Sequence, residues 1–272
     1  MTTRLRPLLA PVVRLLVLLL VAVLALQLYF VARIALMAVI APESTAFERS
    51  EIYRVTRTSG SLKWRQQWVP SAQISVNLQR AVIASEDASF TEHDGLDLEA
   101  LEKAWEKNAV AEARAKKAAD RLAAQAARQG KKTSAAAPLP PAAAKATKPV
   151  KIIGGSTITQ QLAKNLFLSG ERTLLRKGEE LVLTLLLESM LSKQRILEIY
   201  LNSVEWGEGV FGAEAASQHY FRKPASRLSP YEAARLAVML PRPRYFETRP
   251  NSDYLATRAN VIVARMGGVD VP

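Results

Sequence analysis

The chain of 272 residues contains no cysteine and only two histidines. Without cysteine it can form neither a disulfide framework nor a thiolate metal site. His93 and His219 are far apart in the sequence and lack the spacing of zinc ligands, so we expect no zinc site. Sustained period-two alternation of apolar and polar residues is also missing, which predicts a mainly α fold.

The net charge of +12 first suggests a nucleic-acid partner, but its distribution argues against one. Residues 104–151 hold eleven Lys and Arg against three acids, a net +8, which leaves only +4 for the rest of the chain. No recognition helix and no aromatic-basic strand motif accompanies this charge. We therefore expect no nucleic-acid partner.

One long hydrophobic run lies near the N-terminus. Residues 15–32 read LLVLLLVAVLALQLYFVA, and a second apolar stretch continues to Ala41. A helix that crosses a bilayer needs about 20 such residues, so we predict a transmembrane anchor over 15–40 and no later span. The alternative is a cleaved signal peptide, but its apolar part is only about 7–15 residues long and ends at a small-residue site that is poorly matched here.

The charges before the anchor predict its orientation. Arg4, Arg6 and Arg14 precede the apolar run, so residues 1–14 are expected to be cytoplasmic and everything after the anchor to lie outside. Residues 42–70, bounded by prolines, are interpreted as an extended lead-in, and 71–89 as a helix.

Residues 109–150 form a low-complexity insertion rich in Ala, Lys and Pro. Its first half has high helix propensity, and its second half has the composition of a linker. One interpretation is a surface insertion with solvated charges. The other is a basic arm that touches anionic lipid head groups.

The block from 152 to about 246 is predicted to consist of helices. Ser156, after a glycine pair, is a candidate N-cap for a first helix that ends near residue 168. A second helix is predicted over 178–201, deeply buried in its first half because 181–187 is apolar nearly all round. Residues 229–232, Ser-Pro-Tyr-Glu, form a capping box, and the helix that they start should stop at Leu240, before a proline.

Two polar groups in these segments could carry chemistry. Thr157, Gln161 and Lys164 have the spacing of one helix face next to a helix N-terminus, which favours an anion. Arg176 and Lys177 add cations downstream. The group either binds a phosphate or diphosphate or is a structural cap.

Carboxylates form the second group. Glu86 and Asp87 stand where a predicted helix ends, and Glu180 begins an apolar helix. Two carboxylates in separate environments are typical of acid/base chemistry at glycosidic bonds. The alternative for Glu180 is that a helix N-terminus simply favours an acid there.

Five ordered blocks of the sequence resemble the signature motifs of the bacterial peptidoglycan glycosyltransferases. They are EDASFTEHDG (86–95), GGSTITQQLAKN (154–165), RKGEE (176–180), KQRILEIYLN (193–202) and RLAVMLPRP (235–243). The stretch 206–234 strengthens the match, which covers most of 72–246. We expect a member of the monofunctional kind, because too little sequence follows residue 260 for a penicillin-binding transpeptidase domain.

The resemblance implies a lysozyme-like, mainly α domain over 41–260, with a smaller membrane-facing jaw lobe and a C-terminal tail over 261–272. It implies an enzyme of the inner (cytoplasmic) membrane that polymerises lipid II outside the cytoplasm, with the lipid-linked growing glycan as second substrate. The products would be a β-1,4-linked strand, formed with inversion, and undecaprenyl diphosphate. Proteins of cell division or elongation are the expected partners.

The resemblance also implies roles for individual residues. Glu86 would be the general base that deprotonates the acceptor 4-hydroxyl, and Glu180 the second essential carboxylate, which supports the leaving diphosphate or the acceptor. Matching donor-site positions are Ser156, Thr157, Gln161, Lys164, Asn165, Arg176 and Lys177, and matching positions around the base are Asp87, Phe90, His93 and Gly95. No cofactor is expected beyond a loosely bound Mg²⁺ or Mn²⁺, which assists diphosphate chemistry.

The insertion departs from the family pattern, which has only a short loop between residues 95 and 154. It leaves the motifs intact, so we expect activity to be retained. A lysozyme-like lytic enzyme and a non-catalytic cell-wall scaffold are the alternatives. The lytic enzyme would not need the cations at 164, 176 and 177, and a scaffold would not need both glutamates.

Overall fold

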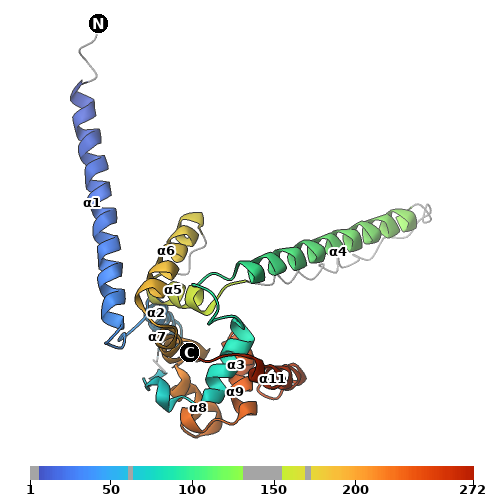
Figure 1. Ribbon diagram of the computed structural model, residues 1–272. Helices are drawn as coiled ribbons and strands as arrows, with labels where there is room; N and C mark the ends of the chain where they lie inside the picture. Colours follow the sequence, from blue (N-terminus) through green and yellow to red (C-terminus); the bar gives the residue numbers. More distant parts are fainter. Residues whose placement is uncertain (1–5, 61–63, 131–154, 169–172) are drawn as a thin grey trace. The chain divides into compact units, whose positions relative to one another are not determined.

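The computed structural model describes residues 6–60, 64–130, 155–168 and 173–272. The chain divides into two compact units. The large unit comprises Met1–Leu96 and Thr157–Pro272, and the small unit comprises Asp97–Ser156. Helices dominate both, as Figure 1 shows, which confirms the predicted mainly α class.

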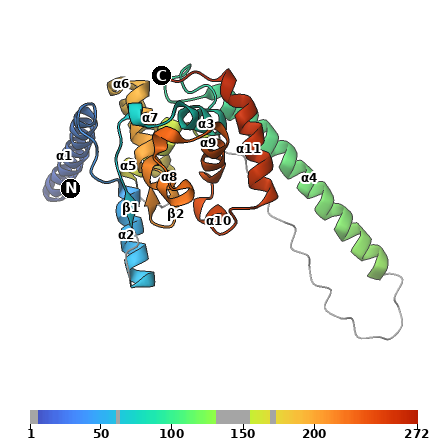
Figure 2. The same cartoon turned by 90° about the horizontal axis from the view of Figure 1, so that it is seen from below.

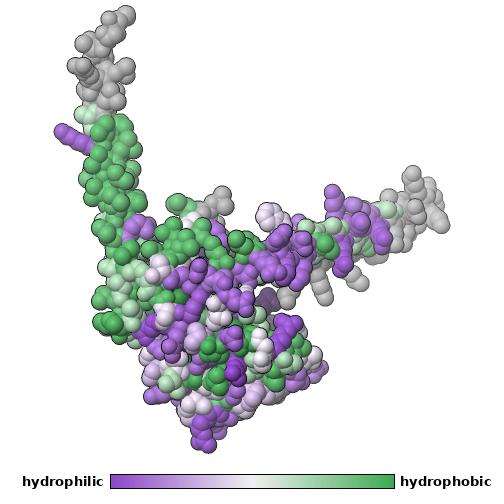
Figure 3. Space-filling model, in the orientation of Figure 1, coloured by the Kyte–Doolittle hydropathy of each residue, from purple (hydrophilic) through white to green (hydrophobic). Residues whose placement is uncertain are grey.

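The first helix, α1 (Arg6–Met37), carries the predicted anchor. Within the described residues it is the one helix long and apolar enough to cross a membrane, over Ala10–Met37. Figure 3 shows hydrophobic residues covering it. Its last turns differ from the rest, because Phe30, Ile34 and Met37 are buried and α1 packs on α6 (Leu174–Met190).

The predicted extended lead-in over 42–70 is wrong, because it contains a helix, α2 (Ala46–Ser59). Thr45 and Glu48 form a capping box, in which Thr45 Oγ1 accepts from the Glu48 N–H at 3.0 Å and Glu48 accepts from the Thr45 N–H at 2.8 Å. Gly60, at φ 64°, ends the helix in a left-handed conformation that glycine adopts without strain.

A small sheet follows, in the order β1-β3-β2. Strand β1 (Arg65–Gln66) pairs parallel with β3 (Val210–Phe211), which pairs antiparallel with β2 (Glu205–Gly207). These strands are too short to give a recognisable alternation in the sequence, so the prediction missed them.

Helices α3 (Val76–Glu86), α9 (Pro230–Met239) and α11 (Asp253–Arg265) pack against one another, and Figure 2 shows them together. The capping box at Ser229 and the end of α9 before Leu240 are confirmed. Helix α11 crosses residue 260, and Met266 after it is buried. The chain beyond residue 260 therefore continues the core.

The second side of the core consists of α5 (Ile158–Phe167), α6 and α7 (Lys193–Ser203). The single helix predicted over 178–201 is wrong, because the chain breaks at residues 191–192, where Ser192 caps α7. The expected deep burial of 181–187 is also wrong in part, since Leu181 and Leu185 are 40% and 47% exposed while Leu183 and Leu187 are fully buried. Helix α6 thus has apolar side chains on both an inner and an outer face.

Shorter helices complete the large unit. They are η1 (Ser71–Gln73), α8 (Ala213–Phe221), η2 (Ala225–Arg227), α10 (Pro243–Glu247) and η3 (Met266–Gly268).

Where the structure describes the small unit, it contains one helix, α4 (Leu98–Gly130), of 33 residues. The helical first half of the insertion is confirmed, but the helix begins well before residue 109. Trp105 on it is 75% exposed. The predicted linker half, residues 131–149, and Gly154 of the second motif lie outside the described residues.

Candidate active site

Glu86 is the last residue of α3, and the chain leaves the helix at Asp87. The following turn contains Phe90, which is fully buried. The ammonium group of Lys193, from α7, lies 4.7 Å from the centre of the Phe90 ring. It also donates to the backbone carbonyl of His93. Lys193 therefore fixes the turn that follows Glu86, although the sequence did not identify it as a site residue.

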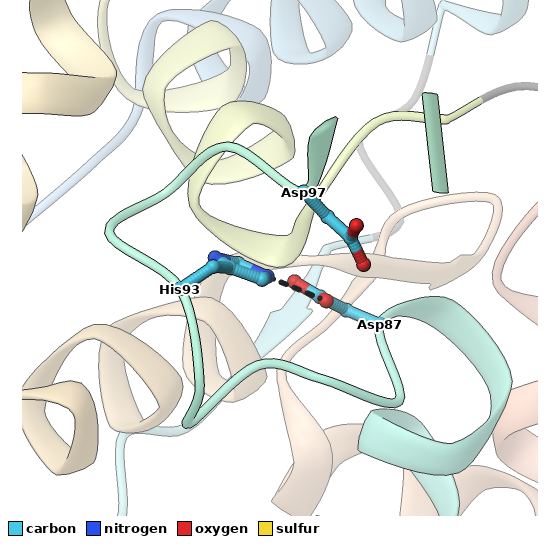
Figure 4. Close-up of side chains that lie close together, drawn as sticks. All are labelled: Asp87, His93 and Asp97. Atoms are coloured by element: carbon cyan, nitrogen blue, oxygen red, sulfur yellow. Dashed lines mark hydrogen bonds and ion pairs between the residues drawn. The ribbon is translucent and has the colours of Figure 1, made fainter. Parts of the chain in front are cut away.

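Asp87 and His93 form a hydrogen-bonded pair within this turn, as Figure 4 shows. The Gly95 N–H donates to His93 Nδ1 at 3.1 Å, so this nitrogen carries no proton. His93 Nε2 therefore donates to Asp87 Oδ1 at 2.9 Å. The backbone thus selects the histidine tautomer, which orients the Asp87 carboxylate.

The other oxygen of Asp87 reaches the start of α5. Asp87 Oδ2 accepts from the Ile158 N–H at 2.9 Å, so the chain's own carboxylate takes one of the N–H groups at this helix N-terminus. This contact supports the structural-cap alternative for that part of the N-terminus. It leaves diphosphate binding by the neighbouring side chains a prediction.

The N-cap of α5 is Thr157, and the prediction of Ser156 is wrong. Thr157 forms a capping box with Gln160, and its hydroxyl also donates to the Gly95 carbonyl at 2.7 Å. Thr157, Gln161 and Lys164 therefore do not form one ligand-facing stripe. Thr157 is buried in structural contacts, Gln161 is half-buried, and Lys164 is exposed.

Gly95 fits tightly against α6. Its φ is +83°, and a Cβ at this position would lie 2.7 Å from Thr184 Cγ2 and 2.8 Å from Glu188 Cγ. Only glycine adopts this positive φ without strain and has no Cβ that would displace α6. The turn 87–95 is thus fixed by α5, α6 and α7 together.

Glu86 itself bonds to α5. Gln161 Nε2 donates to Glu86 Oε2 at 3.0 Å, and the Tyr200 hydroxyl donates to Gln161 Oε1 at 2.9 Å. Burial raises the pKa of the Glu86 carboxyl above its ordinary value; the Gln161 bond lowers it, the Asp87 charge raises it and a Ser85 bond lowers it. A carboxylate with a raised pKa is a stronger base near neutral pH, which suits proton abstraction.

The α6 residues form a separate polar cluster. Glu180 is 4% exposed and pairs with Arg176 Nη1 at 2.9 Å and with Lys177. It lies in the second turn of α6, so the alternative of a simple N-terminal preference is wrong. Two cations share one carboxylate here, which leaves a net positive charge.

Nine of the expected site residues thus fall into two groups on helices that pack together, and Ser156, Lys164 and Asn165 are not assigned to either group. Glu86, Asp87, Phe90, His93, Thr157 and Gln161 meet where α3 ends and α5 begins, and Arg176, Lys177 and Glu180 meet on α6. Helices α5 and α6 pack directly, and the Thr159 hydroxyl of α5 donates to Glu188 of α6. Asn165 is half-buried on α5, and Ser156 is exposed just before it.

Sequence reasoning missed Tyr200, Lys193 and Glu188 as parts of this site. Lys193 bridges the 87–95 turn to Glu188, whose carboxylate lies 2.9 Å from the ammonium group. Tyr200 and Lys193 both lie in KQRILEIYLN, the block at 193–202. Their place in this block was the available signal for these two residues.

Known proteins resemble the chain along most of its length. A family model described as transglycosylase matches residues 53–138 and 139–267. The biosynthetic peptidoglycan transglycosylase of Burkholderia thailandensis is 49% identical over 249 residues, which are 92% of this chain and 83% of that protein. The protein of the same name from Burkholderia orbicola is 48% identical and covers 92% of this chain and 86% of its own length. The family model covers the residues of all five motifs, and the chain belongs to the transglycosylase family and has its lysozyme-like, mainly helical fold.

Proposed function

We propose that this membrane-anchored transglycosylase is a peptidoglycan glycosyltransferase that polymerises lipid II into β-1,4-linked glycan strands. Undecaprenyl diphosphate leaves, and the configuration at the donor C1 is inverted. The observation that carries the proposal is the half-buried Glu86 carboxyl, whose pKa burial raises and which α5 orients through Gln161. The names of the two relatives support the reaction class.

Glu86 is the proposed general base. It takes the proton of the acceptor 4-hydroxyl while that oxygen bonds to C1 of the donor MurNAc. The bond from C1 to the diphosphate oxygen breaks, its electron pair leaves with the diphosphate, and Glu86 ends protonated. Asp87, Phe90 and His93 are proposed to hold Glu86 in place, since their contacts are internal to the turn or link it to its neighbours.

The α6 cluster is the proposed support for the leaving diphosphate. Arg176 and Lys177 outnumber the one carboxylate that they share, so the cluster keeps a positive charge for an anion. Preorganised cations stabilise negative charge where it develops in the transition state. Glu180 positions Arg176 and Lys177. Lys164, Asn165 and Ser156 are further proposed donor-site residues, and Thr157 and Gln161 act through the start of α5 and through Glu86.

We propose no tightly bound cofactor, and any Mg²⁺ or Mn²⁺ would bind loosely with the diphosphate of the substrate. The anchor is proposed to span the inner membrane, with the arginines before it on the cytoplasmic side and the catalytic unit in the periplasm. A lipid-linked substrate in the same bilayer would then reach the enzyme by lateral diffusion. Division or elongation proteins are the proposed protein partners.

The test is polymerisation of labelled lipid II by the purified full-length protein in detergent. We expect polymer from the wild type and from the matched control Glu106→Gln, whose glutamate is exposed on α4. Glu86→Gln should give none, since an amide cannot accept the proton. Digestion of the product by a β-1,4 muramidase checks the linkage.

No polymer from folded wild-type protein, with or without divalent ion, would overturn the proposal. Degradation of purified sacculi would then favour the lytic alternative. Partner recruitment that survives Glu86→Gln would favour the scaffold.

A further inference from the structure

Tyr200 is joined to the proposed base through the side chain of Gln161. Its side chain is fully buried on α7, and its hydroxyl donates to Gln161 Oε1 at 2.9 Å. The same amide donates through Nε2 to Glu86 Oε2 at 3.0 Å. Three side chains from three helices thus form one directed chain of hydrogen bonds that ends on Glu86.

The direction of this chain matters because an amide can be turned by 180° with little change in shape. In the structure Gln161 donates an N–H to Glu86. An ionised carboxylate is a stronger acceptor of this hydrogen bond than a protonated carboxyl group. The reversed amide would present a carbonyl oxygen to Glu86, which favours the protonated acid. It would also take away the acceptor that the buried Tyr200 O–H uses, which costs free energy.

We propose that Tyr200 is a positioning residue: its hydroxyl holds the Gln161 amide in the orientation that keeps Glu86 ionised and able to act as a base. This inference rests on the proposed function, in which Glu86 deprotonates the acceptor. It adds a residue that contacts no reacting atom and a physical reason for a tyrosine at this place.

Among the other groups around the carboxylate, a Ser85 hydrogen bond also favours ionisation, but by less than the Gln161 bond does. Asp87 is adjacent to Glu86 in the chain and its charge opposes ionisation of Glu86, while His93 is paired with Asp87. Burial raises the pKa of Tyr200 well above its ordinary value, with smaller contributions from Glu86 and Asp87. The tyrosine therefore remains a neutral donor throughout the working pH range.

The test is the pH profile of kcat/KM for lipid II polymerisation by Tyr200→Phe. With the hydroxyl removed, the amide can turn, so we expect the acid limb to move upward by about one pH unit. This shift is a tenfold loss of kcat/KM on the acid side. Above the limb, the rate should return to within about twofold of wild type. Damage to the fold would instead lower the rate at every pH.

Two further variants make the outcome decisive. Gln161→Met removes the donor to Glu86 and should move the limb in the same direction, while the added Tyr200→Phe change should then move it no further. Tyr231→Phe, at an exposed tyrosine of α9, should leave the profile unchanged. These comparisons also test the role if Tyr200→Phe alone folds poorly.

An unchanged acid limb in folded Tyr200→Phe, or an equal shift in the Gln161→Met background, would overturn the inference while leaving the proposed function intact. Absence of polymer from the wild type at every pH would instead count against the proposed function. The two failures are therefore distinguishable.

Discussion

Helix α5 is short and packed into the core, whereas helix α4 is long and largely exposed. Helix α5 spans 10 residues, and Ile158, Leu162 and Leu166 on it are fully buried. Helix α4 spans 33 residues, and Leu98, Trp105 and Leu122 on it are more than half exposed. An isolated 10-residue helix is unstable in water, so packing must hold α5. The long alanine-rich helix instead depends on its own propensity.

The two helices also begin differently. Helix α5 starts with the Asp87 carboxylate, a capping box at Thr157 and the Thr157 bond to Gly95. At the start of α4, the Ala100 N–H donates to Asp97 Oδ1 at 2.7 Å. The start of α5 is bonded to residues far away in the sequence, whereas the start of α4 is bonded to the residue just before it. Site geometry in this chain thus comes from long-range contacts.

The largest expected effect comes from the same substitution made in both helices. Leu162→Ala should lower the free energy of unfolding by about 2–5 kcal/mol, because it leaves a cavity in the core. Leu122→Ala removes a side chain that is 55% exposed and should change it by less than about 0.5 kcal/mol. Thermal and denaturant unfolding of the detergent-solubilised protein measure both. Equal effects would contradict the contrast.

A second pair of variants compares the two helix starts. Asp87→Asn removes the charge that meets the Ile158 N–H and His93, and should cost about 1–3 kcal/mol of unfolding free energy. Asp97→Asn should cost only a few tenths, since Asn caps a helix about as well as Asp. Polymerisation should fall with Asp87→Asn alone, because the turn after Glu86 loses its hold. A fully active Asp87→Asn protein would contradict the structural role of this carboxylate.

Local signals predicted those features that short stretches of chain determine. The sequence predicts the capping box at Ser229 and the end of its helix before a proline, and both are confirmed. The equivalent Thr-x-x-Glu box at Thr45 was not predicted. The break before α7 has neither glycine nor proline to announce it. Ser192 is the cap there, and a serine alone is a weak signal.

The site was predictable in its residue types but not in its connections. The bond from Ile158 to Asp87 joins positions 71 residues apart, and the bond from Tyr200 to Gln161 joins positions 39 apart. No periodicity in a single sequence contains such pairings. For the same reason the sequence alone could not show that the Asp87 carboxylate, from another motif, meets the first N–H group of α5.

A smaller effect on stability is expected from Glu86→Gln, compared with the control Glu106→Gln. The folded-state pKa of Glu86 is raised, so at neutral pH the ionised carboxylate destabilises the native state. Glu86→Gln should therefore increase the free energy of unfolding above the raised pKa. The gain should vanish as the pH falls below the unfolded-state pKa of about 4.3, where both states of the wild type become protonated.

Glu106→Gln, at an exposed position of α4, should show no such gain. Unfolding followed at several pH values in the same detergent measures the difference. A Glu86→Gln protein that is less stable than wild type at neutral pH would show that the carboxylate is favourably paired rather than held at a cost.

The smallest effect is expected from removing most of the long helix. The two ends of the small unit lie side by side, since a Cβ on Gly155 would be 3.1 Å from Leu101 Cα. Residue 108 lies roughly 10 Å along the helix from residue 101. Residues 151–155 are long enough to bridge this distance back to Gly155. Replacing 109–150 by a four-residue Gly/Ser loop should therefore leave polymerisation in detergent within about twofold of wild type.

The deletion also separates the two interpretations of the insertion. A solvated surface insertion predicts equal rates for the deletion variant and the wild type in detergent, in neutral vesicles and in anionic vesicles. A basic arm on lipid head groups predicts a loss confined to anionic vesicles, and weaker at high salt because screening shortens the reach of its charges. Loss of activity in detergent itself would contradict both, because it would mean that α4 contributes to the catalytic geometry as directly as α5 does.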